Sequence, residues 1–226
     1  MRNYFNYFTE IEEHFVRKRG KNLLVSPLDW CLIEVWRESG VPLQVVLRGI
    51  DRSFDTALRR HKKVPSTLFY CHQAIMEAFE EYRVAMAGRT EEEEDGACGS
   101  APEAPADSGI VTHLELFLAE VERINDPGCA RVITRLGQLC AEAKKRPEMD
   151  PGELERELTD LQAVLADLFA ERLEASRLRE IKAEVKEQTK IYKKHLSKEM
   201  YERLRQRYLQ RKLLAEHGLP ELTLLA

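Results

Sequence analysis

Hydrophobic residues recur at every third or fourth position along most of the chain, the spacing that gathers them on one face of an α-helix. The clearest case is the segment Ser26–Phe54. Ser26 is a preferred N-cap residue, Pro27 suits the first helical position, Gly40 ends this helix and Pro42 begins the next. Two helices joined by so short a turn must pack at a steep angle, a geometry common in modules that bind nucleic acids or dock partners.

Four helices are predicted in residues 1–87, which we interpret as one helical module. The first covers about Thr9–Arg19, where Thr9 and Glu12 have the spacing of a capping box. The second and third fill Ser26–Phe54, and the fourth runs from about Ser66 to Ala87.

Residues 88–109 form a predicted linker between two helical regions. This segment is rich in Ala, Gly, Ser and Pro and has no apolar period, and residues 90–109 carry seven acidic and no basic residues. The five consecutive acids Glu91–Asp95 repel one another and favour an extended, solvated chain. Competition of this acidic segment with nucleic acid for a basic surface is the alternative interpretation.

Residues 110–226 are predicted to form a second helical region. Two helices at about 110–125 and 128–146 precede a long helix that begins at Pro151. If this helix continues to Leu196, it is about 70 Å long at about 1.5 Å per residue. A final helix is expected over Ser197–Glu216. The long helix contains a coiled-coil seam with spacings of four and three residues, which we predict to bind a partner helix or a second copy of the chain: Leu154, Leu158, Leu161, Leu165 and Leu168.

The composition supports an all-α, globular protein. Apolar residues make up 43% of the 226, and Gly and Pro together number only 20. No apolar run is long enough to cross a membrane, and the acids within the first apolar stretch argue against a signal peptide. Five cysteines without CxxC spacing are typical of reduced, mostly buried thiols. We therefore expect a cytoplasmic protein.

No sequence signature of catalysis is found. The chain lacks the GxSxG, P-loop, GxGxxG and HExxH motifs. Cys71 and His72 are adjacent, but neighbours on a helix point about 100° apart, so burial of both is favoured over a nucleophilic dyad. Zinc held by these two residues and Cys31 would still need a fourth ligand. We expect no enzymatic activity, no cofactor, no metal and no small-molecule substrate.

Basic residues offer a stronger hint of function. Two runs follow the first and third predicted helices, and two further arginines lie one turn apart on the third helix. Together they form a face able to neutralise phosphates, so DNA is a possible partner. The alternative is that these residues only complement helix dipoles. The candidate nucleic-acid-binding residues are Arg17, Lys18, Arg19, Lys21, Arg48, Arg52, Arg59, Arg60, Lys62 and Lys63.

A groove-reading helix-turn-helix is not expected from Ser26–Phe54. If Gly40 is the turn glycine, the residue four positions earlier should be small, because the two helices touch there. This residue is Trp36, which we interpret instead as the core anchor of a helical bundle.

A second basic zone covers Lys186–Lys212, with ten Lys or Arg and three acids. It follows an acidic half at Asp150–Val185, a polarity that suits pairing with another helix. Its Tyr201 and Tyr208 are expected to be buried beneath a solvated face, with single-stranded nucleic acid as the alternative ligand.

The N-terminal module resembles the DnaD family of bacterial replication-initiation proteins, through the stretch from Leu24 to the end of the third helix and STLFYCHQAI from Ser66. The later Tyr-x-x-x-Ile-x-x-x-Trp element of that family is represented only by Tyr70 and Ile75, at a different spacing. The resemblance implies a DNA-associated role in replication and assigns no binding residue. The positions that match the family outline are Ser26, Pro27, Leu28, Ile33 and Trp36.

The whole chain also resembles an uncharacterised bacterial family whose sequences begin like NYFTEIEE and end like HGLPELTLL. This second resemblance implies no function. The sequence as a whole leaves two hypotheses of function: a DNA-associated accessory protein, and a structural adaptor without a nucleic-acid role.

Overall fold

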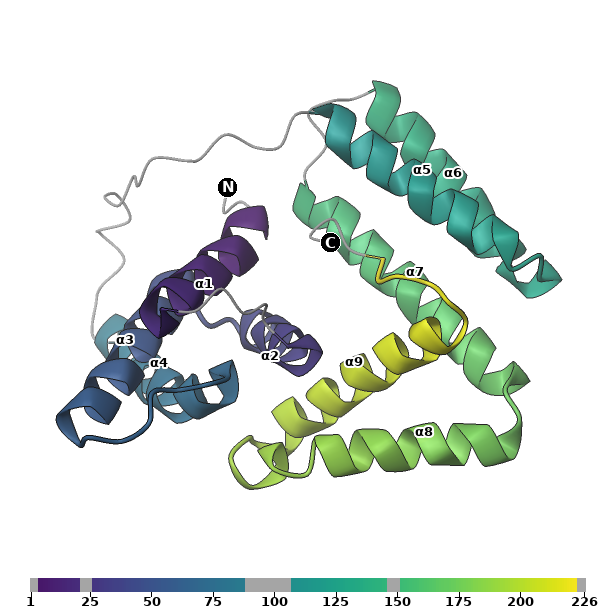
Figure 1. The fold of residues 1–226 in the computed structure, drawn as a ribbon. Coiled ribbons are helices and arrows are strands. Elements are labelled where there is room, and N and C mark those ends of the chain that lie inside the picture. Colours follow the sequence, from purple (N-terminus) through teal and green to yellow (C-terminus); the bar gives the residue numbers. More distant parts are fainter. Residues whose placement is uncertain (1–3, 21–25, 88–106, 146–150, 223–226) are drawn as a thin grey trace. The chain divides into compact units, whose positions relative to one another are not determined.

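The computed structural model describes residues 4–20, 26–87, 107–145 and 151–222, and every regular element within them is helical (Figure 1). The all-α prediction is confirmed. The contacts divide the chain into two units. We call Asn6–Pro102 with Thr189–Leu204 the N-terminal unit, and Met1–Phe5, Glu103–Gln188 and Arg205–Ala226 the C-terminal unit.

The N-terminal unit begins with α1 (Tyr4–Arg19), followed by α2 (Pro27–Glu38) and α3 (Leu43–Arg59). The signals at both ends of α2 act as expected. The Ser26 side chain accepts a hydrogen bond from the Asp29 amide, and Gly40 has a φ of +76°. The prediction that Thr9 caps the first helix is wrong, because α1 begins five residues earlier and Thr9 lies inside it.

The third and fourth helices also differ from their expected bounds. α3 continues past Phe54 to Arg59, so the second basic run begins inside its last turn. The fourth helix does not start at Ser66. A 3₁₀ turn, η1 (Leu68–Cys71), comes first, and α4 (His72–Ala87) follows it.

Trp36 is the centre of the N-terminal core, as predicted. It is fully buried, together with side chains of α1, α3 and α4 such as Ile11, Ile50 and Ile75. Gly49 allows α3 to approach α4 closely, since a Cβ at this position would lie 2.5 Å from the Cα of Ile75. The core thus fixes α3, which carries the candidate residues Arg48, Arg52 and Arg59.

A segment distant in sequence belongs to the same unit. Thr189–Leu204 contains a 3₁₀ turn, η3 (Tyr192–Lys194), and the start of α9 (Lys198–Glu216). The Tyr192 ring meets the Phe69 ring at 4.6 Å between centroids, and Tyr192 is 3% exposed. The sequence placed this segment in the C-terminal region, whereas the structure groups it with the N-terminal unit.

The C-terminal unit contains α5 (Asp107–Arg123), a 3₁₀ turn η2 (Pro127–Cys129), α6 (Ala130–Lys145), α7 (Pro151–Arg172), α8 (Ala175–Gln188) and the second half of α9. Residues 107–109 of the predicted linker are helical, and residues 88–106 lie outside the described part of the chain. The backbone amide of Leu222 donates to Gln162 Oε1 at 3.0 Å and ties the end of the chain to α7.

The long helix expected from Pro151 does not continue to Leu196. It is broken between Arg172 and Ala175, where Leu173 and Glu174 leave the helix, and it ends at Gln188. The hydrophobic seam falters at the same two positions, Arg172 and Ala175, so neither supplies an apolar side chain to hold a continuous helix in place.

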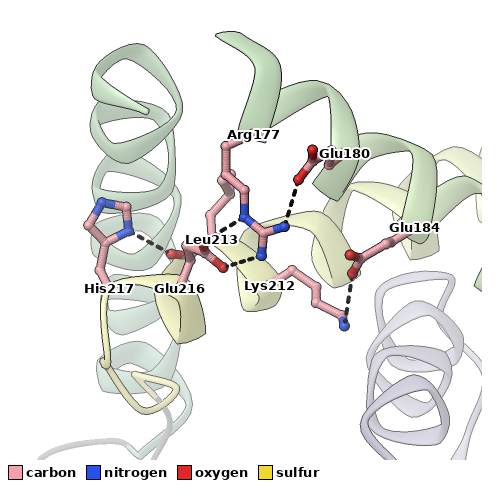
Figure 2. A network of polar contacts seen from close by, with 7 residues as sticks. All are labelled: Arg177, Glu180, Glu184, Lys212, Leu213, Glu216 and His217. Carbon is pink, nitrogen blue, oxygen red and sulfur yellow. Dashed lines mark hydrogen bonds and ion pairs between the residues drawn. The ribbon is translucent and has the colours of Figure 1, made fainter. Parts of the chain in front are cut away.

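α8 and α9 are joined by an ion-pair network on the surface of the C-terminal unit (Figure 2). Arg177 Nε and one terminal guanidinium nitrogen donate to the Glu216 carboxylate at 2.8 and 2.9 Å. The other terminal nitrogen donates to Glu180 at 2.9 Å. Lys212 lies 3.6 Å from Glu184. The side chains are partly exposed, and surface pairs of this kind contribute little to stability individually, so we interpret the network as structural.

Candidate nucleic-acid interface

The two basic runs lie at the same end of the N-terminal unit, because α1 and α3 run side by side in the same direction (Figure 1). Tyr7 near the start of α1 donates to the carbonyl of Val41 just before α3, at 3.0 Å. Farther along, the rings of Phe15 and Phe54 meet at 5.8 Å. The C-terminal ends of α1 and α3 therefore point the same way, and the basic runs at or just after these ends are Arg17–Arg19 and Arg59–Lys63.

Asp51, in the middle of α3, links this helix to the last turns of α1. Its Oδ1 accepts a hydrogen bond from Lys18 Nζ at 2.8 Å and lies 2.8 Å from His14 Nε2. Burial raises the pKa of the Asp51 carboxyl, but the contacts with Lys18 and His14 outweigh it and hold the pKa below its usual range. The hydrogen bond to Asp51 in turn raises the pKa of Lys18. The charge of Lys18 is thus engaged in packing α1 against α3.

Arg52 is also engaged by an acid. Its guanidinium forms two hydrogen bonds with the Glu81 carboxylate, at 2.8 and 2.7 Å, and so joins α3 to α4. The same contact lowers the pKa of Glu81. Arg17 lies 3.9 Å from Glu13, one turn earlier on α1. The pairs of Lys18 and Arg52 join different helices, so part of the predicted phosphate-binding set serves the packing of the unit, whereas the Arg17 pair lies within α1.

The end of α3 presents the more accessible cations. The helix closes in a Schellman motif, in which the amides of His61 and Lys62 donate to the carbonyls of Leu58 and Ala57 at 3.1 and 2.9 Å. His61 takes the left-handed position with a φ of +50°. This turn fixes the direction of the basic run as it leaves the helix. The exposed side chains of the candidate set, other than those paired above, are Arg48, Arg59, Arg60, Lys62 and Lys63.

Two candidates need separate mention. Arg19 is half-buried at the end of α1, and Lys21 lies outside the described residues. The face that the structure assembles at this end of the unit is therefore narrower than the ten residues predicted from sequence, and its centre is the end of α3.

Cys71 and His72 are packed side chains. Cys71 is fully buried, and burial raises the pKa of its thiol to about 12. Burial also lowers the pKa of His72 to about 4, and its Nδ1 accepts a hydrogen bond from Trp36 Nε1 at 2.9 Å. A thiol so far from ionisation beside an imidazole already engaged with Trp36 does not form a nucleophilic pair. In the described ranges, no three His, Cys, Asp or Glu side chains come close enough to hold a metal ion.

The leucine seam of α7 packs within the chain. Leu154, Leu158 and Leu165 are at most 2% exposed, and Leu161 and Leu168 are half-buried. α6 packs against α7, and the backbone amide of Leu222 donates to Gln162 of α7. A role of the three buried leucines in binding a separate helix finds no support in this packing.

Two grooves indent the surfaces of the units. One, of about 920 Å³, runs along α4 between Gln73 and Ala85 and ends at His195. The other, of about 520 Å³, lies between α6 and α7, where Leu161 and the exposed Val164 meet Arg131.

The tyrosines of the second basic zone are buried, as predicted. Tyr201 and Tyr208 are 6% and 7% exposed, and the Tyr208 hydroxyl donates to Gln188 Oε1 at 2.5 Å. Arg211 and Lys212 pair with Glu221 and Glu184. The C-terminal half of this zone is thus largely committed to contacts within its own unit.

Sequence reasoning missed the Asp51 contacts and the exposed Tyr70. A helical wheel of α3 puts Asp51 beside Asp55 on a polar face, but nothing in the sequence says that α1 covers that face. Tyr70 was noted only as part of a family outline, and its exposure of 62% follows from η1, which no sequence signal announced.

Comparison with known proteins gives one match. A family model described as "Uncharacterised protein" matches residues 6–91, which span α1 to α4. No curated protein and no solved structure matches the chain. None of these comparisons indicates similarity to the DnaD family. No helix in the described ranges is long and apolar enough to cross a bilayer.

Proposed function

We propose that this is a non-enzymatic, cytoplasmic accessory protein that binds DNA through the basic end of its N-terminal unit. The observation that carries the proposal is the parallel alignment of α1 and α3, which brings the basic runs Arg17–Arg19 and Arg59–Lys63 to one end of the unit. Cations gathered on one face neutralise several phosphates at once and release their counterions, which is the main source of affinity for nucleic acids.

The pairing pattern favours the end of α3 as the contact surface. Lys18 and Arg52 already have carboxylate partners, so their charges are partly compensated. Arg59 Nε donates to the carbonyl of Asp55 at 3.3 Å, and the two terminal guanidinium nitrogens of Arg59 take no part in this bond. The side chains of Arg60, Lys62 and Lys63 are exposed. A role in replication rests on the DnaD resemblance of the N-terminal module alone.

The absence of catalysis is part of the same proposal. Cys71 and His72 are the adjacent Cys and His that could have formed a nucleophilic dyad. The raised pKa of the Cys71 thiol and the lowered pKa of His72 support the absence of such a dyad. Both of these grooves are open to solvent, and neither is lined by a serine or cysteine beside a histidine.

Charge removal at the end of α3 tests the proposal. We would replace Arg59, Arg60, Lys62 and Lys63 by Gln and measure binding of the full-length protein to labelled DNA by fluorescence anisotropy. The matched control replaces four exposed cations of the C-terminal unit by Gln: Lys145, Arg179, Lys182 and Lys186.

Arg179 is a close match for Arg59, because its Nε also donates to the carbonyl four residues earlier, that of Ala175 at 3.0 Å. The proposal predicts that the first set weakens binding strongly and the control set weakens it little, although both change the net charge equally. Equal losses would mean that only overall charge matters, and the proposed surface would be wrong.

A second candidate function is that of an adaptor that binds a partner helix or a second copy of the chain. The groove between α6 and α7 favours it, because Val164 is 52% exposed there beside Leu161. Light scattering of the wild type and of Val164→Glu would test self-association. A monomeric wild type would exclude the self-associating form.

A further inference from the structure

Tyr70 is an aromatic side chain that stands largely in solvent. It is 62% exposed, whereas the neighbouring Phe69 is half-buried. Tyrosines usually place part of their ring against apolar surface, so an exposed ring offers a face to something outside the unit.

The ring stands on a rigid base. Phe69 meets Tyr70 edge-on at 5.6 Å between centroids, and Phe69 is itself held by Tyr192 at 4.6 Å and His195 at 5.1 Å. The backbone is fixed as well, because Ser53 Oγ of α3 donates to the Tyr70 carbonyl at 3.3 Å. An aromatic group held in this way loses little conformational freedom on binding.

Basic residues lie on the two elements that hold Tyr70 and Phe69 in place. Ser53, which contacts the Tyr70 carbonyl, is seven residues before Arg60, so the end of α3 lies about 10 Å along the chain from Ser53 at about 1.5 Å per residue. Lys193 and Lys194 are exposed and lie between Tyr192 and His195 in sequence, and the rings of these two residues both touch Phe69. The acidic residues of α4, Glu77 and Glu81 among them, line the groove beyond His195.

We propose that Tyr70 is a stacking platform for the bases of single-stranded nucleic acid, whose phosphates lie along the end of α3 and the η3 lysines. The inference rests on the proposed function and names its ligand class. Exposed bases stack on aromatic rings flanked by cations, whereas the bases of a duplex are already stacked on one another.

A membrane surface is the other ligand that a basic face with exposed apolar groups can bind. Helices that bind membrane surfaces bury a continuous apolar face in the lipid. Tyr70 instead lies on a four-residue 3₁₀ turn. The arrangement thus fits stacking of separate bases better than burial in lipid.

The test uses the full-length protein with Tyr70→Ala and Tyr70→Phe, and Ile191→Ala as the control. Ile191 is 56% exposed and lies beside the same lysines, but it is not aromatic. The probe is a short DNA oligonucleotide containing 2-aminopurine, offered single-stranded or annealed to its complement. Quenching of 2-aminopurine fluorescence reports stacking of this base directly. If Tyr70 had only a structural role, this quenching would not depend on its ring.

We expect Tyr70→Ala to weaken single-strand binding about 5- to 150-fold and to abolish the quenching. Tyr70→Phe, which keeps the ring, and Ile191→Ala should bind like the wild type, and duplex binding should be unaffected by all three. Wild-type affinity and quenching in Tyr70→Ala would overturn the inference while leaving the proposed function intact. Absence of binding to either DNA form, or binding only to anionic vesicles, would overturn both.

Discussion

Trp36 Nε1 donates a hydrogen bond to His72 Nδ1 at 2.9 Å in the core of the N-terminal unit, and the angle between the planes of the two rings is 7°. An indole nitrogen can only donate, so Nδ1 of His72 must carry no proton. The ring proton is then on Nε2, which serves the hydrogen bond to the backbone of His195. One neutral imidazole therefore connects α2, α4 and the distant segment that contains η3.

The stability of the N-terminal unit should depend on the charge of His72. Burial lowers its pKa from the ordinary 6.5 to about 4. Between these values the unfolded chain takes up the proton first, so stability is fully present above pH 6.5 and is lost as the pH falls to about 4. The loss is about 3 kcal/mol, as expected for a shift of this size.

Urea unfolding followed by tryptophan fluorescence measures this effect, because both tryptophans, Trp30 and Trp36, lie in the N-terminal unit. His72→Gln is the control, since an amide can accept from Trp36 but does not titrate in this range. The difference in unfolding free energy between the wild type and His72→Gln should change between pH 6.5 and 4. A constant difference would contradict the assignment of a buried neutral ring.

Tyr192 should stabilise the N-terminal unit although it follows α4 by about a hundred residues. It is 3% exposed and packs against Phe69, so Tyr192→Ala should cost about 3 kcal/mol through loss of burial and the cavity left behind. Ile191→Ala, one residue earlier and largely exposed, should cost almost nothing. Urea unfolding followed by tryptophan fluorescence compares the stability losses of the two variants. Equal losses would mean that the segment does not pack on η1.

Gly49 should tolerate no side chain. The new Cβ of Gly49→Ala would lie 2.5 Å from the Cα of Ile75 and 2.8 Å from its amide nitrogen, so α3 and α4 would have to separate. We expect a loss of about 1–3 kcal/mol, seen as a lower melting temperature by circular dichroism. Gly137→Ala on α6 meets nothing within 4 Å and should stabilise by up to about 1 kcal/mol. A neutral Gly49→Ala would contradict the close approach of the helices.

The cysteines of the described ranges should resist modification in the folded protein. Cys31, Cys71, Cys129 and Cys140 are buried, and burial raises the pKa values of the last three. In a Cys98→Ser background, reaction with a thiol reagent at neutral pH should be slow until denaturant is added. Rapid reaction of Cys71 in the native protein would reopen a nucleophilic role for it.

Elements with complete local signals could be predicted from the sequence. α2 carries its N-cap at Ser26 and its left-handed terminator at Gly40, and both act as expected. Trp36 was assigned to the core because its bulk excludes a tight helix crossing, and it is fully buried. In these cases the chain's own chemistry specifies the structure without help from distant residues.

The features that depend on tertiary packing could not be predicted. The break after Arg172 and the 3₁₀ turn η1 have no strong breaker residue, and the placement of Thr189–Leu204 depends on a surface formed by other elements. Likewise, the sequence counted Lys18 and Arg52 as available for phosphates, because it does not reveal that Asp51 and Glu81 face them.

The salt dependence of DNA binding tests the central claim most directly. We would measure the affinity of the wild type and of the variant with Arg59, Arg60, Lys62 and Lys63 replaced by Gln at several salt concentrations. The logarithm of the wild-type association constant should fall linearly with the logarithm of salt concentration, and the slope should be smaller by about 3 in the variant, as the loss of several phosphate contacts requires. Equal slopes for the two proteins, or no binding by the wild type at low salt, would contradict a nucleic-acid interface at the end of α3.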